Sequence, residues 1–146
     1  MGARYSVNRG SVVLSSAADT LTLIAPATRA LKLWEMRIYG QGTSSAANDI
    51  GLMRSTGGVT PGGVIVPVPL ALLSPASGVT VNTTWVTQPT VGVIVRRLGC
   101  NSNGAYSPLV FMPGSEIDIP PNGQISLRAI AGTGTVTVEL VFEEVG

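Results

Sequence analysis

The chain has 146 residues, of which 45% are hydrophobic and only 12% are charged, and its net charge is +1. This length fits a single domain, 1–146, that can bury its own core, and the lone cysteine, Cys100, excludes an internal disulfide. The low net charge, with no basic cluster beyond Arg96-Arg97, argues against a nucleic-acid partner, which requires a concentrated positive surface. The longest apolar run, 64–73, is broken by prolines and too short to span a membrane, and we expect no signal peptide.

The elements expected in chain order are short strands, because apolar and polar residues alternate between frequent glycines and prolines. The predicted strands are 4–7, 12–14, 20–24, 30–39, 50–54, 91–98, 109–112, 116–119, 124–130 and 135–142. The first belongs to an extended N-terminal segment, 1–8. About eight to ten strands at this spacing predict an all-β fold, a two-sheet antiparallel jelly-roll sandwich.

Three segments between the strands have other expected roles. Residues 55–63 are glycine-rich and predict a flexible connection, and residues 74–89 predict a long polar loop excursion around Trp85. The segment 64–70 is apolar and extended, but Pro67 and Pro69 cannot donate hydrogen bonds to a sheet. We therefore expect it along a sheet edge or as a covering segment.

The alternation in two strands predicts which side chains are buried. In 30–39, Trp34, Met36 and Ile38 share one face, which we assign to the core, whereas Glu35 and Arg37 share the other. In 135–142, the four apolar residues at even positions, 136 to 142, face one way.

The chain contains no histidine, so triads of the Ser/His/Asp or Cys/His kind are excluded, and a zinc site is improbable. Glu116 and Asp118 share a strand face at a spacing compatible with acid–base chemistry, but a solvated face before a turn explains them better. The pair at 143–144 indicates a solvated end, and Asn48-Asp49 lacks the spaced acidic loop of a calcium site. We expect no catalytic residue, no cofactor and no metal.

The low charge fits a surface covered by other protein, because interface cores are depleted of charged residues. Eight of the nine basic residues are arginine, with Lys32 the only lysine. Arginine is enriched and lysine depleted at interfaces, although a GC-rich genome would produce the same bias. Trp85 has three open roles: a lid over the sandwich edge, an anchor into a neighbouring subunit, or a platform on which a sugar stacks.

Two parts of the sequence resemble small structural proteins of phages and prophages. At the start these are 4–7, the run Thr-Leu-Thr-Leu-Ile-Ala-Pro-Ala at 20–27, and Lys-Leu-Trp-Glu-Met-Arg-Ile at 32–38; near the end it is Pro-Pro-Asn-Gly-Gln-Ile-Ser-Leu-Arg at 120–128. In size and architecture the chain is similar to jelly-roll head-decoration, or cement, proteins of tailed bacteriophages. That resemblance implies a homotrimer on the capsid exterior that binds and stabilises the major capsid protein, made in the host cytoplasm.

The residues expected at such an interface include the N-terminal strand, the proline-containing segment, the isolated tryptophan and the arginine pair. They are Arg4, Tyr5, Val66, Pro67, Val68, Pro69, Trp85, Arg96 and Arg97. Either the segment 1–8 or the segment 66–70 could add to a sheet edge of a neighbour. The alternative function is a tail or spike module that binds a host glycan, for which Trp85, Tyr39 and Tyr106 are the candidate platform.

Overall fold

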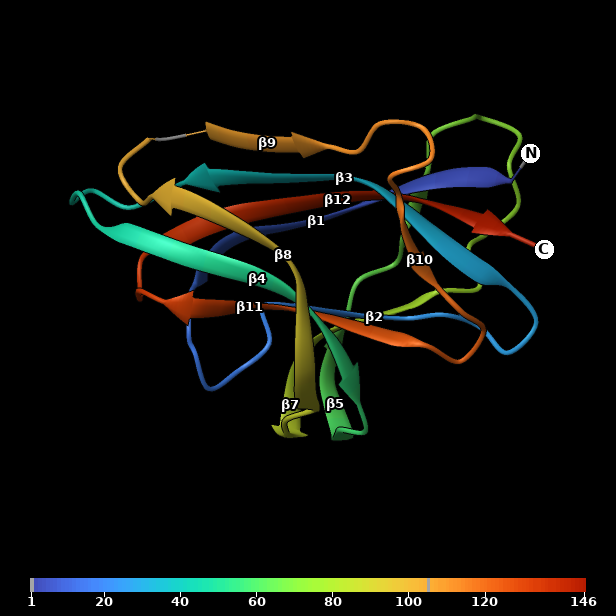
Figure 1. Ribbon diagram of the computed structural model, residues 1–146, viewed down its shortest axis with the longest axis horizontal. Coiled ribbons are helices and arrows are strands. Elements are labelled where there is room, and N and C mark those ends of the chain that lie inside the picture. Colours follow the sequence, from blue (N-terminus) through green and yellow to red (C-terminus); the bar gives the residue numbers. More distant parts are fainter. Residues whose placement is uncertain (1, 105) are drawn as a thin grey trace.

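A computed structural model describes residues 2–104 and 106–146, and it is an all-β sandwich of two six-stranded antiparallel sheets (Figure 1). The first sheet, sheet A, contains β1 (Ala3–Val13), β3 (Ala30–Gly40), β6 (Val68–Pro69), β9 (Tyr106–Val110), β10 (Ile117–Ile119) and β12 (Thr135–Val145). The second, sheet B, contains β2 (Leu21–Ile24), β4 (Ala47–Thr56), β5 (Val59–Val64), β7 (Thr80–Thr87), β8 (Thr90–Asn101) and β11 (Gln124–Ala131).

The order of the strands confirms the predicted jelly roll. Sheet A runs β10-β3-β12-β1-β6, with β9 following β10 along the same edge of β3. Sheet B runs β5-β7-β2-β11-β4-β8. Without β5, β6 and β7, the chain passes back and forth between two four-membered sheets, β1-β12-β3-β9/β10 and β2-β11-β4-β8, which is the jelly-roll arrangement.

The three remaining strands form one insertion, residues 57–89, between β4 and β8. It begins and ends at neighbouring points, because Thr56 and Thr90 are paired across the β4–β8 hairpin. Inside it, β5 and β7 pair with each other, and β7 extends sheet B beyond β2. The short strand β6 pairs with β1 and extends sheet A. The insertion therefore covers the same side of both sheets.

The core lies between the sheets and follows the predicted alternation in most strands. Val136, Val138, Leu140 and Phe142 are fully buried, as expected from their shared face. Leu21 and Leu23 are buried opposite them on sheet B, separated by Thr22. Period-two alternation places such residues on the inner face, and burying them supplies most of the stability of the fold.

The prediction for Trp34 is wrong, and a β-bulge explains why. Val141 pairs with Glu35 and the next residue, Phe142, pairs with Leu33, so Trp34 is the extra residue on β3. The bulge reverses the alternation within the strand. Leu33 is buried before it and Met36 after it, whereas Trp34 is only partly buried.

The N-terminal segment forms a longer strand than the sequence predicts. Met1 lies outside the described residues, and Ala3 to Val13 form one strand rather than two. A register shift between Arg9 and Val12, with Ser11 at a positive φ of 50°, lies between the two predicted strands, 4–7 and 12–14. This strand, β1, is an inner strand of sheet A, because it pairs with β12 on one side and, over part of its length, with β6 on the other.

The insertion contains more regular structure than predicted. The glycine-rich part contributes β5, and the predicted excursion 74–89 contributes β7, in which Val81 belongs to the core. The segment 64–70 does lie along a sheet edge, as predicted, because Tyr5 pairs with Pro69 and Ser6 with Val68.

Candidate interaction surface

The insertion lies within a long stretch of sequence without charge. No Asp, Glu, Lys or Arg occurs between Arg54 and Arg96, a run of 41 residues. Ten of the fourteen exposed large hydrophobic side chains in the described part of the chain belong to this run. They are Val59, Val64, Val66, Val68, Leu70, Leu72, Leu73, Val86, Val93 and Ile94. Contiguous exposed apolar surface on a soluble domain usually marks a site of interaction.

Six of these ten side chains, including the two most exposed, lie on one segment, residues 64–73, which we call the apolar strap. Its backbone is fixed to both sheets: the amide of Ile65 donates to Val81 (3.0 Å) and the amide of Leu70 donates to Arg4 (2.9 Å). It ends in a turn closed by a bond from Ser74 N to Ala71 O (3.0 Å). Leu72 and Leu73, within that turn, are 97% and 96% exposed.

A buried carboxylate holds the chain that follows the strap. Glu144 on β12 accepts hydrogen bonds from the amide of Gly78 (2.8 Å), from the hydroxyl of Ser77 and from Arg29 Nη1 (2.8 Å). Burial alone would raise the pKa of Glu144, but these three hydrogen bonds and the positive charge of Arg29 outweigh it and hold that pKa below its usual value. The hydroxyl of Tyr5 adds a bond to the carbonyl of Pro75 (2.9 Å).

The expectation that Glu143 and Glu144 form a solvated end is therefore wrong, since they are only 7% and 3% exposed. Glu143 accepts hydrogen bonds from the amide of Gly2 (2.7 Å) and from the indole of Trp34 (3.0 Å). Both carboxylates have enough donors to replace the water they lose on burial, which is the condition for burying a charge.

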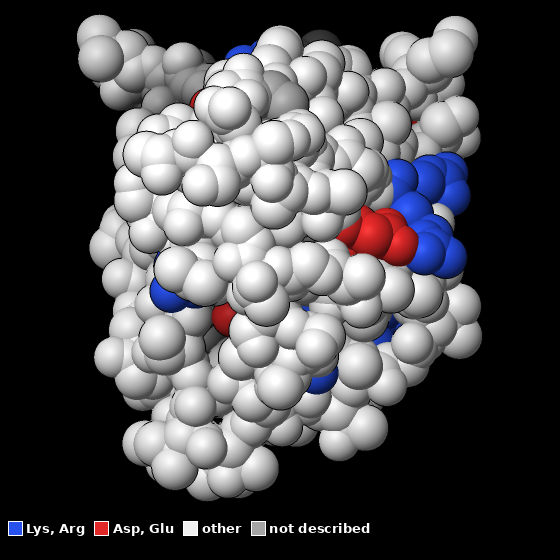
Figure 2. All heavy atoms as spheres, turned by 90° about the vertical axis from the view of Figure 1, so that its left-hand side faces the viewer, with Lys and Arg blue, Asp and Glu red and all other residues white. Residues whose placement is uncertain are grey.

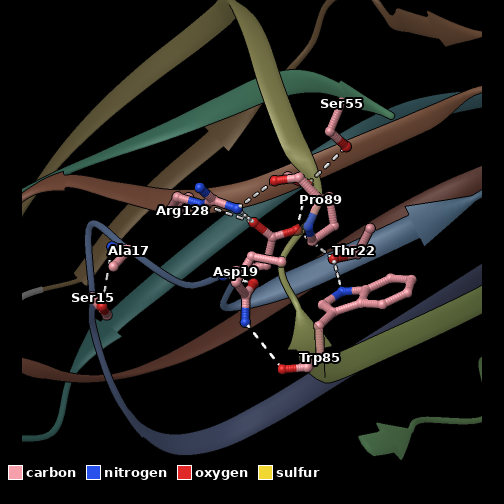
Figure 3. A network of polar contacts seen from close by, with 10 residues as sticks. Ser15, Ala17, Asp19, Thr22, Ser55, Trp85, Pro89 and Arg128 are labelled. Carbon is pink, nitrogen blue, oxygen red and sulfur yellow. Dashed lines mark hydrogen bonds and ion pairs between the residues drawn. The ribbon is translucent and has the colours of Figure 1, made fainter. Parts of the chain in front are cut away.

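A second polar network holds the last part of the insertion, from β7 to Pro89, as Figure 3 shows. The indole nitrogen of Trp85 donates to Thr22 Oγ1 (2.9 Å), and that hydroxyl donates to Asp19 Oδ2 (2.6 Å). The Trp85 ring packs against Gly58, where a Cβ atom would lie 2.7 Å from ring carbons. Of the three roles considered for Trp85, the contacts within the chain match the lid over the sandwich edge.

The centre of this network is a buried ion pair. Neither oxygen of Asp19 is accessible, and Arg128 Nε on β11 donates to Asp19 Oδ1 (2.7 Å). Arg128 also donates to the carbonyl of Pro89 at the end of the insertion (3.2 Å; Figure 3). The carboxylate accepts a further bond from the hydroxyl of Ser126. The pair thus joins the loop before β2, the strand β11 and the end of the insertion, immediately before β8.

The opposite end of the sandwich carries a different uncharged surface, formed by four loops that we call the loop end. They are residues 14–20, 41–46, 102–104 and 132–134. Their only charged residue in the described part of the chain is the buried Asp19. Figure 2 faces this end: uncharged residues cover most of the view, charged side chains gather in one group at one side, and only small parts of others show elsewhere.

Hydrogen bonds tie the loop end together. The amide of Gly42 donates to Ser102 (2.6 Å), and that of Leu14 donates to Gly134 (3.0 Å). The side chain of Asn48 accepts from the amide of Gly134 (3.0 Å) and donates to the carbonyl of Cys100 (3.2 Å). A pocket of about 240 Å³ between the loops is lined by small uncharged residues: Gly42, Thr43, Ser44, Ala46, Ser102, Thr133, Gly134 and Thr135.

Comparisons with protein-family models, with curated proteins and with solved structures give no match. Function is therefore argued from these surfaces. Among the described residues, no group of three or more His, Cys, Asp or Glu side chains comes together to hold a metal ion. No helix in this part of the chain is long and apolar enough to cross a membrane.

The structure brings part of the predicted interface together on one side. Pairing of β1 with β6 places Arg4 and Tyr5 beside the strap, whose Val66 and Val68 are exposed. Tyr5 itself is fully buried against Phe142, with ring centroids 5.7 Å apart, so it contributes to the core rather than to a surface. Its burial follows from the inward-facing position that it occupies on β1.

The other predicted interface residues have different surroundings. Within the strap, Pro67 is buried and Pro69 is partly buried. Arg96 and Arg97 are exposed on β8, at the edge of sheet B opposite β5, and Arg97 pairs with Asp49.

Sequence reasoning missed the two leucines at the turn of the strap, and it missed both buried carboxylate networks. The uncharged run between Arg54 and Arg96 is visible in the sequence and could have drawn attention to Leu72 and Leu73. The pairing of Asp19 with Arg128 joins residues 109 positions apart, for which the sequence carries no local signal.

Proposed function

We propose that this chain is a structural protein of a phage virion, a decoration or cement protein that binds the major capsid protein on the capsid exterior as a homotrimer. The observation that carries the proposal is the apolar, uncharged surface of the insertion, which is fixed to both sheets by hydrogen bonds. The resemblance of residues 4–7, 20–27, 32–38 and 120–128 to phage structural proteins indicates which kind of assembly this surface would join.

The physical properties of the chain suit this task. A rigid domain loses little conformational entropy when it docks, so more of its contact energy contributes to binding. Uncharged surfaces also avoid the large cost of removing water from charged groups. Three copies joined in one trimer bind neighbouring capsid subunits together, which converts modest contacts into high avidity.

The alternative of glycan binding has less support from the three candidate aromatic residues. The indole of Trp85 is engaged by Gly58 and Thr22. The rings of Tyr39 and Tyr106 stack on each other, with centroids 4.8 Å apart, and Tyr106 is 52% exposed. A sugar platform would therefore rest on one half-exposed tyrosine.

Co-sedimentation with capsids tests the proposal. Purified chain is mixed with expanded capsids of the phage that carries its gene, stripped of any endogenous copy, and the pellet is quantified. We expect binding that saturates at a fixed number of copies per capsid and raises the temperature at which the capsid opens. Absence of binding to capsids, together with binding to host glycans on an array, would refute it.

A further inference from the structure

We infer that the apolar strap, residues 64–73, is the surface through which copies of this chain associate with one another. The inference deepens the proposed function, on which it rests, by naming the contact that joins the copies. The occupant of the strap is a second copy of the same chain.

The first argument is the degree of exposure. Leu72 and Leu73 are 97% and 96% exposed, and Val66 is 77% exposed. Burying each of these side chains away from water would lower the free energy, and all three lie within the same ten-residue segment. Single exposed hydrophobic residues are common on protein surfaces, but a continuous group of them marks a contact site.

The second argument is that the backbone below these side chains is held in place. The strap is bonded to β7 at Ile65 and to β1 at Leu70, and Glu144 fixes the residues that follow it. A flexible loop with the same composition could fold its leucines back onto the protein. This backbone instead holds the leucines exposed to solvent. Because it is already ordered, association would cost little further conformational entropy.

The third argument identifies the occupant. The buried core of an interface between permanent copies of one chain is depleted of charged residues and is more apolar than other interfaces. The strap contains no charged residue. The nearest basic side chain on β1, Arg4, stacks over the Trp34 ring (4.3 Å) and lies 3.8 Å from Glu143, so its charge is already paired within the chain.

The size and character of the surface agree with this occupant. Of the 25 residues from Thr56 to Thr80, 17 are exposed. Standard interfaces use about 20–30 residues on each side, so the strap and the exposed residues beside it supply most of one side. Interfaces between permanent copies are the most apolar class. The loop end, which is polar and built from small residues, is the less apolar of the two uncharged surfaces and is left for a different partner.

The experiment compares two matched double variants by sedimentation velocity over a range of protein concentration. Leu72→Ser with Leu73→Ser alters the strap, and Val110→Ser with Met112→Ser alters two other exposed apolar residues, 59% and 74% exposed, at the β9 edge. We expect wild type and the β9-edge variant to form the same oligomer. The strap variant is expected to be monomeric, or to need at least a hundredfold more protein to associate.

A strap variant that remains as oligomeric as wild type would overturn the inference, as would a wild-type chain that is monomeric throughout. Equal dissociation of both variants would also overturn it, because the effect would then not belong to the strap. Circular dichroism checks folding, and Val66→Ser with Val68→Ser provides a second alteration of the same surface, expected to weaken association in the same direction.

Capsid binding separates this inference from the proposed function. If the wild-type oligomer depends on Leu72 and Leu73 but does not bind capsids, the proposed function fails and the strap contact stands. If the chain binds capsids and its oligomer is indifferent to the strap, the proposed function stands and this inference fails.

Discussion

Replacement of Arg128 by methionine tests how much the buried ion pair with Asp19 stabilises the fold. The substitution keeps an aliphatic stem of similar length but leaves the Asp19 carboxylate, whose side chain is 0% exposed, without its charged partner. Removing one member of a buried pair costs about 3–5 kcal/mol of unfolding free energy. For a domain of this size, that corresponds to a fall in Tm of roughly 6–20 °C.

The assay is urea unfolding of wild type, Arg128→Met, Asp19→Asn and the double variant, which together form a thermodynamic cycle. We expect the double variant to be more stable than Arg128→Met, because no charge is then left unpaired in the interior. Arg97→Met is the matched control: its partner Asp49 lies at the surface, so its loss should be far smaller. Equal losses for Arg128→Met and Arg97→Met would refute the reasoning.

Three further predictions concern the contacts that hold the insertion in place. Glu144→Gln should lower the unfolding free energy by about 1–3 kcal/mol at neutral pH, through weaker hydrogen bonds, with the exposed Asp118→Asn as control. Because folding lowers the pKa of Glu144 from the usual 4.5, its carboxylate stabilises the folded state above that pH, and this stabilisation declines as the pH falls below it. In acid unfolding curves, wild type should therefore lose its greater stability relative to Glu144→Gln. A stability difference that does not change with pH would contradict this. Trp85→Phe should lower the unfolding free energy in urea by about 0.5–1.5 kcal/mol, through loss of the hydrogen bond to Thr22. In a chain that already carries Thr22→Val, the same substitution should have a much smaller effect, because that hydrogen bond is already absent. Gly58→Ala should cost about 1–3 kcal/mol, since φ is +100° and the new methyl meets the Trp85 ring, whereas Gly57→Ala has the positive φ of 73° but open space and should cost less.

The sandwich itself could be predicted from the sequence because strand alternation is a local property. The faces of β2 and β12 and the turn at 120–123 follow directly from neighbouring residues. The bulge at Trp34 could not be predicted in this way, since it arises from the register between β3 and β12. One extra residue on one strand is enough to move an aromatic side chain from the expected inner face to a partly exposed position.

The surface was harder to predict than the fold. The exposure of the strap depends on where the insertion runs, and its course is set by pairing with β1 and β2, which lie more than 40 residues earlier in the chain. Glu144 has the same limitation, because its partners Ser77 and Arg29 come from distant segments. Composition did show that charged residues are scarce, and the structure shows that the exposed apolar side chains gather on the uncharged insertion.

The prolines of the strap have a consequence for the size of any assembly. The short strand β6 is the outer member of sheet A, where a free strand edge would invite another chain to continue the sheet and so grow into a fibre. Pro67 and Pro69 have no amide hydrogen to offer along that edge. Copies that meet along this edge would do so mainly through side chains, so the sheet would not continue from one copy into the next.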